Sequence, residues 1–244
     1  MALEIQTHLL GEGRGSVEIS RDGNHSYKVN GGAKLQNVTS YLGHLDADGF
    51  GMGSGWVQKV IKESGGDVDA VASASRASRD EGSALHDEIH QWITREQQVN
   101  ENSPMFISWL HMADQLFDDE GMTFVASERF VYHPELGYAG TVDAIGASDR
   151  EPGFAIFDWK TRDYDQFQKR GPYLKDMVQV GAYAHALYSM RSIYGEILPK
   201  GYVVYLFRGD TVRMPYIKEV NIENSMQLFV AARALHNLVI EAKI

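Results

Sequence analysis

Short apolar segments separated by polar turns dominate the middle of the chain. Residues 138–145 and 154–159 are rich in β-branched and aromatic side chains, and the turn between them contains a proline and a glycine. This pattern predicts a β-hairpin. Residues 123–132 alternate between apolar and polar side chains, which predicts a third strand directly before the hairpin. Residues 201–207 and 211–220 predict a second hairpin.

Apolar residues at helical spacing flank these strands. Residues 83–98, 106–117, 174–194 and 223–242 each carry such a stripe, which predicts amphipathic helices. The last helix is expected to pack against the sheet through Met226, Phe229, Val230, Leu235, Leu238 and Val239.

Together these elements predict an α/β (α+β) fold in a single domain, residues 1–244. Residues 1–80 are expected to form a variable, β-rich or irregular lead-in, residues 81–200 the core, and residues 201–244 a C-terminal hairpin and helix. The chain has 244 residues, of which 43% are hydrophobic. That is enough to bury one sizeable core.

Composition removes several classes of site. The sequence contains no cysteine, which excludes disulfides, thiolate zinc sites, a cysteine nucleophile and an iron–sulfur cluster. The first residues do not have the pattern of a signal peptide, and no segment approaches the ~20 apolar residues of a membrane span. We therefore expect a soluble, cytoplasmic protein with no membrane partner.

The net charge of −10 argues against a protein that coats nucleic acid without sequence preference. This objection weakens if carboxylates gather at a metal site, because a bound cation reverses the local sign of the charge. It weakens further because basic residues concentrate between residues 160 and 175, among them Lys160, Arg162, Lys169 and Arg170. A solvated charged loop is the alternative interpretation of that stretch.

The central hairpin places an acid and an amine on one surface. Side chains alternate across a strand, so Asp158 and Lys160 project to the same face, whereas Phe157 and Trp159 project to the other. If Asp143 on the neighbouring strand points the same way, two carboxylates and an ammonium converge. Such a group is suited to a hard divalent cation that holds a phosphate. The pattern therefore indicates phosphodiester hydrolysis.

The predicted helix before these strands carries two histidines on its apolar side. Ser78 and Glu81 have the spacing of a capping box, so this helix is expected to begin near them. The order His86-Asp-Glu-Ile-His90 invites comparison with a zinc-protease helix, in which glutamate directly follows the first histidine. Asp87 stands at that position, which disfavours a protease. A satisfied structural histidine remains the alternative for His86.

Two further polar features lie near the predicted hairpin. Glu128 falls on an otherwise apolar strand face, where a carboxylate is costly unless something polar meets it. A strand-edge glutamate in water is the other interpretation. Gln179 and Tyr183 are four residues apart on a predicted helix, so they present an amide and a phenol on one face.

These groups occur in a fixed order that resembles a known nuclease pattern. The segments are Gly82-Ser-Ala-Leu-His86, a strand with Glu128, Gly140-Thr-Val-Asp143, Phe157-Asp-Trp-Lys160-Thr and Gln179-Val-Gly-Ala-Tyr183. In this order and spacing the chain resembles the P-D-(D/E)-x-K nuclease superfamily, in particular its RecB-like branch. That branch includes the mitochondrial genome maintenance exonuclease and many phage nucleases. The resemblance extends from about residue 82 to residue 183.

The resemblance implies a restriction-endonuclease-like core, a small mixed sheet flanked by helices, with Mg²⁺ or Mn²⁺ as cofactor. It implies that His86, Asp143 and Asp158 are metal ligands, joined by the backbone carbonyl of Trp159. Lys160 would be the catalytic lysine.

The resemblance also assigns roles to the remaining polar residues. Glu128 matches a frequently acidic position and would reach a metal through water. Gln179 and Tyr183 match a downstream helix motif that organises the site or contacts DNA. Val142 replaces the proline of the superfamily name, which this branch tolerates. The absence of cysteine excludes the subgroups that carry an iron–sulfur cluster.

The expected activity is therefore that of a metal-dependent deoxyribonuclease. We expect an exonuclease that hydrolyses single-stranded or frayed DNA ends, in phage-like recombination or repair. A structure-specific endonuclease or resolvase of the same fold is one alternative. A non-catalytic DNA-binding recombination accessory protein is another.

Overall fold

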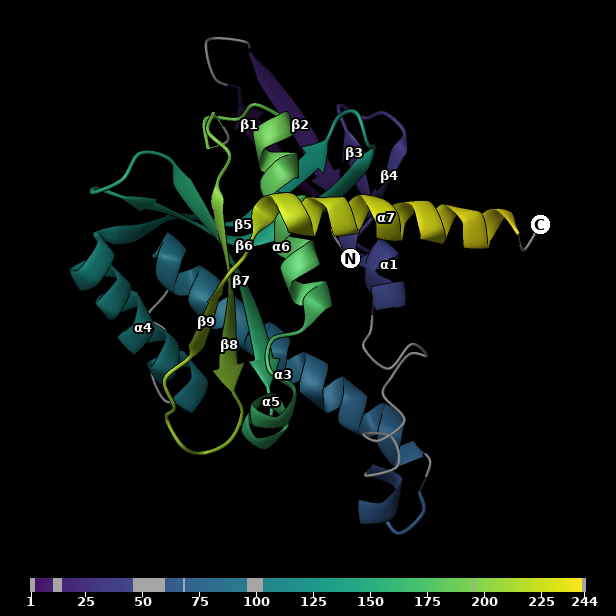
Figure 1. Cartoon of the computed structure of the whole chain (residues 1–244), viewed down its shortest axis with the longest axis vertical. Helices are drawn as coiled ribbons and strands as arrows, with labels where there is room; N and C mark the ends of the chain where they lie inside the picture. Colours follow the sequence, from purple (N-terminus) through teal and green to yellow (C-terminus); the bar gives the residue numbers. More distant parts are fainter. Residues whose placement is uncertain are drawn as a thin grey trace.

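Nine described strands form one mixed β-sheet, and helices cover both of its faces (Figure 1). This computed structural model describes residues 3–10, 15–45, 60–67, 69–95, 103–194 and 196–242. The α/β class with a mixed sheet flanked by helices is confirmed. The sheet is larger than expected because the N-terminal lead-in adds four strands to it.

The N-terminal strands form an antiparallel meander. It consists of β1 (Glu4–Leu9), β2 (Ser16–Arg21), β3 (Tyr27–Val29) and β4 (Lys34–Asn37). A short parallel pairing joins β4 to β6 (Tyr138–Ser148), with Gln36 opposite Tyr138. Two short helices, α1 (Val38–Tyr41) and η2 (Leu42–Leu45), follow β4. The prediction of a β-rich lead-in is confirmed for these residues.

The central hairpin is present as predicted. β6 pairs antiparallel with β7 (Phe154–Arg162), with Ala144 opposite Phe157, and β5 (Met122–His133) pairs antiparallel along β6. β8 (Lys200–Phe207) lies parallel to β7, and β9 (Tyr216–Glu219) pairs antiparallel with β8. The parallel β7–β8 step requires a crossover, which α5 (Tyr164–Arg170) and α6 (Leu174–Ser189) provide.

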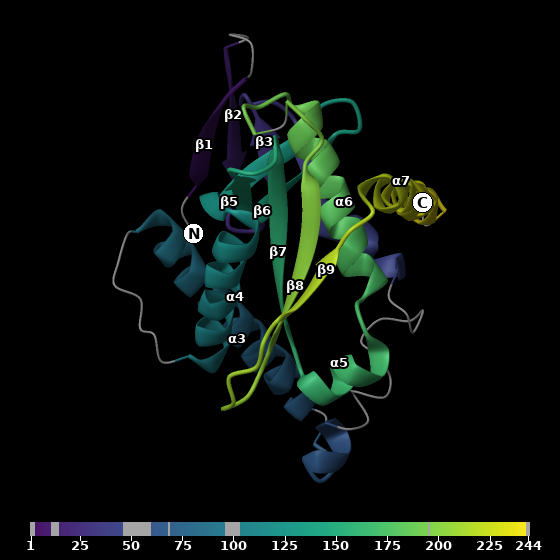
Figure 2. The same ribbon diagram turned by 60° about the vertical axis from the view of Figure 1, so that its left-hand side comes forward.

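The helices lie on opposite sides of the sheet. α3 (Asp69–Thr94) and α4 (Pro104–Glu120) cover one face, and α6 covers the other, with α7 (Ile222–Glu241) beyond it (Figure 2). Trp109 of α4 packs on Trp159 of β7. Side chains alternate along a strand, so Trp159 lies on the face opposite to Asp158, as expected. None of the described helices combines the length and apolarity that a membrane span requires.

The predicted start of α3 is wrong. The helix begins at Asp69 rather than near Ser78. The residues between these positions are mostly alanine and serine, and the alanines favour helix strongly enough to continue it back by two turns. Ser78 therefore lies inside the helix, and the spacing of Ser78 and Glu81 does not mark a cap.

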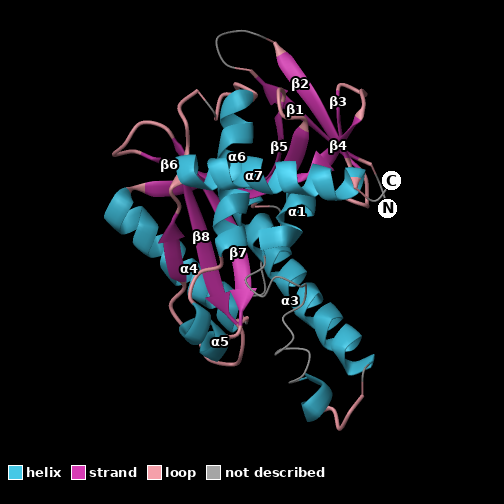
Figure 3. Ribbon diagram, turned by 45° about the vertical axis from the view of Figure 1, so that its right-hand side comes forward, coloured by secondary structure: helices cyan, strands magenta, loops and turns pink. Residues whose placement is uncertain are grey.

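The predicted packing of the last helix is only partly right. Met226 and Phe229 are buried, but Val230, Leu235 and Leu238 are 44%, 47% and 62% exposed. α7 crosses α6 instead of lying on the sheet, and its C-terminal half extends past α6 (Figure 3). Because α6 lies between α7 and the sheet, only the first half of the α7 stripe reaches a core.

Candidate metal centre and nucleic-acid cavity

Three polar side chains from three elements gather beside the central strands. His86 of α3, Glu128 of β5 and Asp143 of β6 each bring one ligand atom into a group whose members lie within 4.8 Å of one another. An imidazole nitrogen and two carboxylate oxygens together form a donor set for a divalent cation. We therefore treat this cluster as a candidate metal centre.

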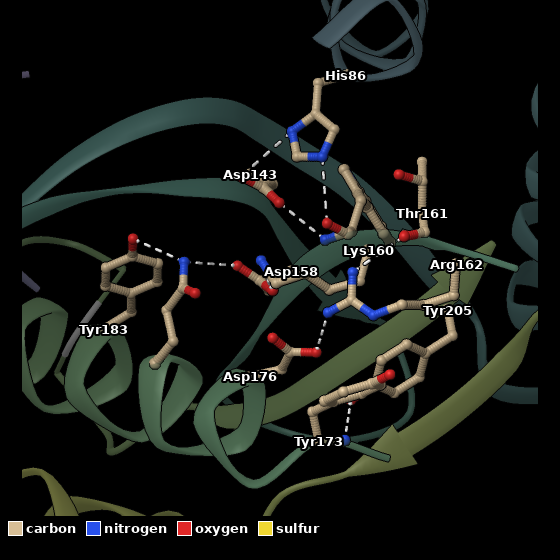
Figure 4. Close-up of polar contacts among 12 residues, drawn as sticks. His86, Asp143, Asp158, Lys160, Thr161, Arg162, Tyr173, Asp176, Tyr183 and Tyr205 are labelled. Carbon is tan, nitrogen blue, oxygen red and sulfur yellow. Dashed lines mark hydrogen bonds and ion pairs between the residues drawn. The ribbon is translucent and has the colours of Figure 1, made fainter. Parts of the chain in front are cut away.

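The Trp159 peptide fixes the orientation of two members of the cluster (Figure 4). Asp143 Oδ2 accepts a hydrogen bond from the Trp159 N–H at 2.8 Å. His86 Nε2 lies 3.1 Å from the Trp159 carbonyl oxygen, and His86 Nδ1 lies 3.6 Å from Asp143 Oδ1. A carbonyl only accepts, so Nε2 carries a proton and Nδ1 faces the carboxylate. A cation held by Nδ1 and Asp143 Oδ1 would stabilise this arrangement.

Glu128 occupies an unusual backbone conformation. Its φ of 50° lies in the left-handed region, although the residue is inside strand β5. For a residue other than glycine this conformation costs about 1–3 kcal/mol and persists where the surroundings hold it. Burial, together with the neighbouring Asp143 carboxylate, raises the pKa of Glu128 to about 8. A nearby cation would stabilise the ionised form of this carboxyl group.

Asp158 and Lys160 form a tight ion pair on the same face of β7. Lys160 Nζ lies 2.5 Å from Asp158 Oδ2, and Asp158 is 2% exposed. Burial raises the pKa of Asp158 to about 7 in spite of the ammonium beside it. Burial alone would lower the pKa of Lys160, but the carboxylates of Asp158, Asp176 and Asp143 raise it overall. Lys160 is therefore a protonated ammonium.

The downstream helix contributes an amide and a phenol to this site. Gln179 Nε2 donates to Asp158 Oδ1 at 3.2 Å and to the Tyr183 hydroxyl at 3.0 Å. The Tyr183 ring approaches β6 closely at Gly140, where an added Cβ would lie 2.4 Å from a ring carbon. Glycine at position 140 therefore leaves the space that Tyr183 needs to reach the site.

Arg162 lies at the end of β7 and is held by protein groups. Its guanidinium donates to Asp176 Oδ2 at 2.6 Å and lies over the rings of Tyr173 and Tyr205. Asp176 is buried. The Arg162 guanidinium, which was expected to contact DNA, is therefore already engaged by a buried carboxylate.

A cavity of about 630 Å³ opens beside these groups. Its wall includes His86, Glu128, Asp143, Lys160, Gln179 and Tyr183. The rest of the lining comes from the end of β2, the β2–β3 turn, β3, β4 and α1, and includes Arg21, Tyr27 and Lys34. Thr141 links this part to β6, because its hydroxyl lies 2.7 Å from the Tyr27 hydroxyl and accepts from Arg21 at 3.1 Å.

The N-terminal residues of this cavity were not predicted from the sequence. Arg21 and Tyr27 lie more than a hundred residues before Thr141. No local motif marks them, since their role arises from the parallel pairing of β4 with β6. Thr141 lies within the Gly140-Thr-Val-Asp143 segment, where strand alternation places it on the same face as Asp143.

The structure brings together most of the residues predicted for the site, in a different grouping. His86 and Asp143 lie close together beside the Trp159 carbonyl, but the third member of their cluster is Glu128. Asp158, expected as a ligand, is engaged by Lys160 and Gln179 instead. Lys169 and Arg170 are exposed on α5, outside the described lining of the cavity.

Comparisons with known proteins add little to this geometry. No protein-family model matches the sequence, and no curated protein matches it. The solved structure of SSO0001 is similar to this chain with a TM-score of 0.31 and 16% sequence identity. The similarity covers 55% of this chain and 57% of that one, so the chain spans little more than half the length of its structural neighbour. A likeness this distant says nothing about the function of this chain.

Proposed function

We propose that this chain is a metal-dependent DNA exonuclease that hydrolyses phosphodiester bonds at single-stranded or frayed ends. One observation carries the proposal. The His86, Glu128 and Asp143 cluster and Lys160 line the same cavity, so a candidate cation site and an ammonium face a common space.

The donor set fits Mg²⁺ or Mn²⁺. Both carboxylates supply the hard oxygen ligands that Mg²⁺ and Mn²⁺ prefer, and the imidazole adds a nitrogen ligand that a transition metal such as Mn²⁺ accepts. Glu128 supports the fit independently, because its pKa is raised to about 8 by burial and by the neighbouring Asp143 carboxylate. A divalent cation offsets the repulsion between these two carboxylates.

His86, Glu128 and Asp143 would hold the metal. When bound, it would supply an activated water and would neutralise charge on the phosphoryl oxygens. Asp143 also holds the Trp159 peptide through its N–H, and so ties the cation site to the strand that carries Asp158 and Lys160. The second carboxylate oxygen of Asp143 remains directed at His86.

Lys160 is suited to an electrostatic role. Its pKa is raised overall by the surrounding carboxylates against the effect of burial, so it is a poor general base and a good partner for a phosphoryl oxygen. Asp158 orients the Lys160 ammonium, and Gln179 orients the Asp158 carboxylate. Lys160 therefore stabilises negative charge that develops on the phosphate and on the leaving oxygen.

The shape and charge of the cavity support a DNA strand end as substrate. Its volume of about 630 Å³ is that of a small-ligand pocket, which accommodates a strand end rather than a continuous duplex. Arg21 and Lys34 line the same cavity, and Arg21 also forms an ion pair with Glu4. They offer positive charge to backbone phosphates in a chain whose net charge is −10.

The test compares end-labelled linear and circular single-stranded DNA in Mg²⁺ and in EDTA. We expect the linear strand alone to be degraded, only with the metal, and we expect Lys160→Ala to abolish cleavage while the protein stays folded by circular dichroism. Lys218→Ala, on β9 and outside the described cavity lining, is the matched control. Cleavage of circles would instead indicate an endonuclease. Binding without any cleavage would indicate a DNA-binding accessory protein.

A further inference from the structure

The side chain of Gln6 forms hydrogen bonds with the backbone on both sides of residue 129. Gln6 Nε2 donates to the Glu128 carbonyl at 2.7 Å, and Gln6 Oε1 accepts from the Phe130 N–H at 2.9 Å. Gln6 belongs to β1, whose own backbone pairs with β2. Both polar atoms of the Gln6 amide thus bond to the backbone of β5, a strand with which the β1 backbone does not pair.

The amide of Gln6 takes the place of a neighbouring strand at a point of strain. In a parallel ladder, a strand residue likewise bonds the carbonyl of one residue on the neighbouring strand and the N–H two positions on. Glu128 has the left-handed φ of 50°, and the β5–β6 ladder passes from Ser127 opposite Ala144 to Arg129 opposite Val142. The two hydrogen bonds from Gln6 therefore fall where the backbone departs from regular strand geometry.

The other edge of the irregular backbone is also held by a side chain. Ser127 Oγ donates to the Asp143 carbonyl at 2.9 Å, across the ladder toward β6. A second link from β1, between His8 Nδ1 and Arg129 Nη2, joins side chains and leaves the Glu128 backbone untouched. Among the described hydrogen bonds, Gln6 is the contact from β1 that acts on the Glu128 peptide.

We propose that Gln6 is a positioning residue for the candidate metal centre, holding the left-handed backbone at Glu128 so that its carboxylate faces His86 and Asp143. This inference rests on the proposed function, because it assigns Glu128 to the cation site. If the backbone at Glu128 left the left-handed region, the direction of its Cα–Cβ bond would change, and the carboxylate would move from its present place beside His86 and Asp143. The N-terminal meander thereby controls metal affinity at a distance in sequence of 122 residues.

The test measures Mn²⁺ affinity by calorimetry in the full-length chain. Gln6→Met removes both hydrogen bonds at similar volume, Gln6→Asn is a milder change that keeps the amide but shortens its reach, and Gln227→Met on exposed α7 is the control. We expect Mn²⁺ binding to weaken about tenfold or more in Gln6→Met, as for other groups that orient a ligand. We expect a smaller loss in Gln6→Asn and none in the control.

A double-variant cycle separates positioning from general destabilisation. If Gln6 acts through the Glu128 carboxylate, Gln6→Met has no further effect on Mn²⁺ affinity once Glu128→Gln has removed that ligand. Hydrogen exchange at the Phe130 amide is the second readout. Its protection should fall in Gln6→Met, and in the unaltered chain it should rise when Mn²⁺ is added.

The outcomes distinguish failure of this inference from failure of the proposed function. The role of Gln6 would be overturned if Gln6→Met left Mn²⁺ affinity unchanged, or if it lowered that affinity equally with and without Glu128→Gln. It would also be overturned if the unaltered chain bound Mn²⁺ without any change in hydrogen-exchange protection at the Phe130 amide. Absence of Mn²⁺ binding by the unaltered chain would overturn the metal centre itself, and the role of Gln6 with it.

Discussion

The Asp143 carboxylate accepts a hydrogen bond from the backbone N–H of Trp159 at 2.8 Å. This contact links the side chain of one predicted motif to the backbone of the other, across the antiparallel pair β6–β7. Asp143 is 8% exposed, so the hydrogen bond is sheltered from water. The same carboxylate thus has a structural role toward Trp159 and a proposed role toward a cation.

Substitution of Asp143 separates these two roles. In Asp143→Asn the amide oxygen still accepts from the Trp159 N–H but the charge is lost, so we expect the fold to persist and Mn²⁺ binding to weaken at least tenfold. In Asp143→Ala the buried N–H also loses its partner, which should cost a further 1–3 kcal/mol or so of unfolding free energy. Calorimetry and urea unfolding measure the two effects. Equal stability of the two variants would refute the structural role of this hydrogen bond.

Gly140 provides a test of the contact between β6 and α6. Gly140→Ala would place a methyl group 2.4 Å from a Tyr183 ring carbon, so the ring must move and its hydrogen bond with Gln179 must break. We expect a loss of about 1–3 kcal/mol in stability, as for other overpacked sites, and a lower cleavage rate. Gly43→Ala is the matched control, because an added Cβ there has nothing within 4 Å. Urea unfolding measures the stability of both variants. Equal losses of stability in Gly140→Ala and Gly43→Ala would contradict the prediction.

The parts of the site that follow local periodicity could be predicted from the sequence. Asp158 and Lys160 share a face because strands alternate, and Gln179 meets Tyr183 because helical residues four apart are neighbours. The central hairpin also follows from short patterns, whereas the mixed sheet was expected from the nuclease resemblance. These inferences needed only the conformation of one element at a time.

The parts that depend on long-range packing could not be predicted. Gln6 acts on Glu128 only because the meander lies beside β5, which no local pattern encodes. The exposed Leu235 shows the same limit, since the apolar stripe of α7 does not reveal that α6 lies beneath its first half alone. The grouping of Glu128 with His86 and Asp143 likewise depends on how three elements pack together, which the pattern of one strand does not show.

His8 should make stability depend on pH. Burial lowers its pKa to about 4, and the Arg129 guanidinium contributes. The folded state therefore binds the proton less readily than the unfolded state, whose histidine titrates near pH 6.5. The stability associated with neutral His8 is complete above about pH 6.5 and is lost as the pH falls toward 4, by up to about 3 kcal/mol.

Comparison of two histidine variants isolates this effect. His8→Asn keeps an acceptor for Arg129 without a titrating ring, so its stability should fall less between pH 7 and pH 4 than that of the unaltered chain. His111→Asn, at an exposed position of α4, should leave the pH dependence unchanged. Urea unfolding at several pH values measures both. Parallel curves for the unaltered chain and His8→Asn would refute the assignment.

Arg162 and Lys169 are expected to differ in what they contribute, although both belong to the basic stretch. Arg162 pairs with buried Asp176, so Arg162→Met leaves an uncompensated carboxylate and should cost about 3 kcal/mol or more in stability. Lys169 is exposed on α5. If it contacts a phosphate, Lys169→Met leaves stability unchanged and lowers the salt dependence of single-strand binding by about 0.7 in logarithmic slope.

Unfolding and DNA-binding measurements on the same two variants decide between these roles. A stable Arg162→Met protein with weakened DNA binding would return Arg162 to the DNA contact expected from the sequence. That result would require Asp176 to release its partner when DNA binds, because the guanidinium cannot donate the same N–H to both a carboxylate and a phosphate. Loss of stability together with unchanged salt dependence would instead assign Arg162 to the junction of β7 and α6, where it holds the crossover that presents Gln179 to Asp158.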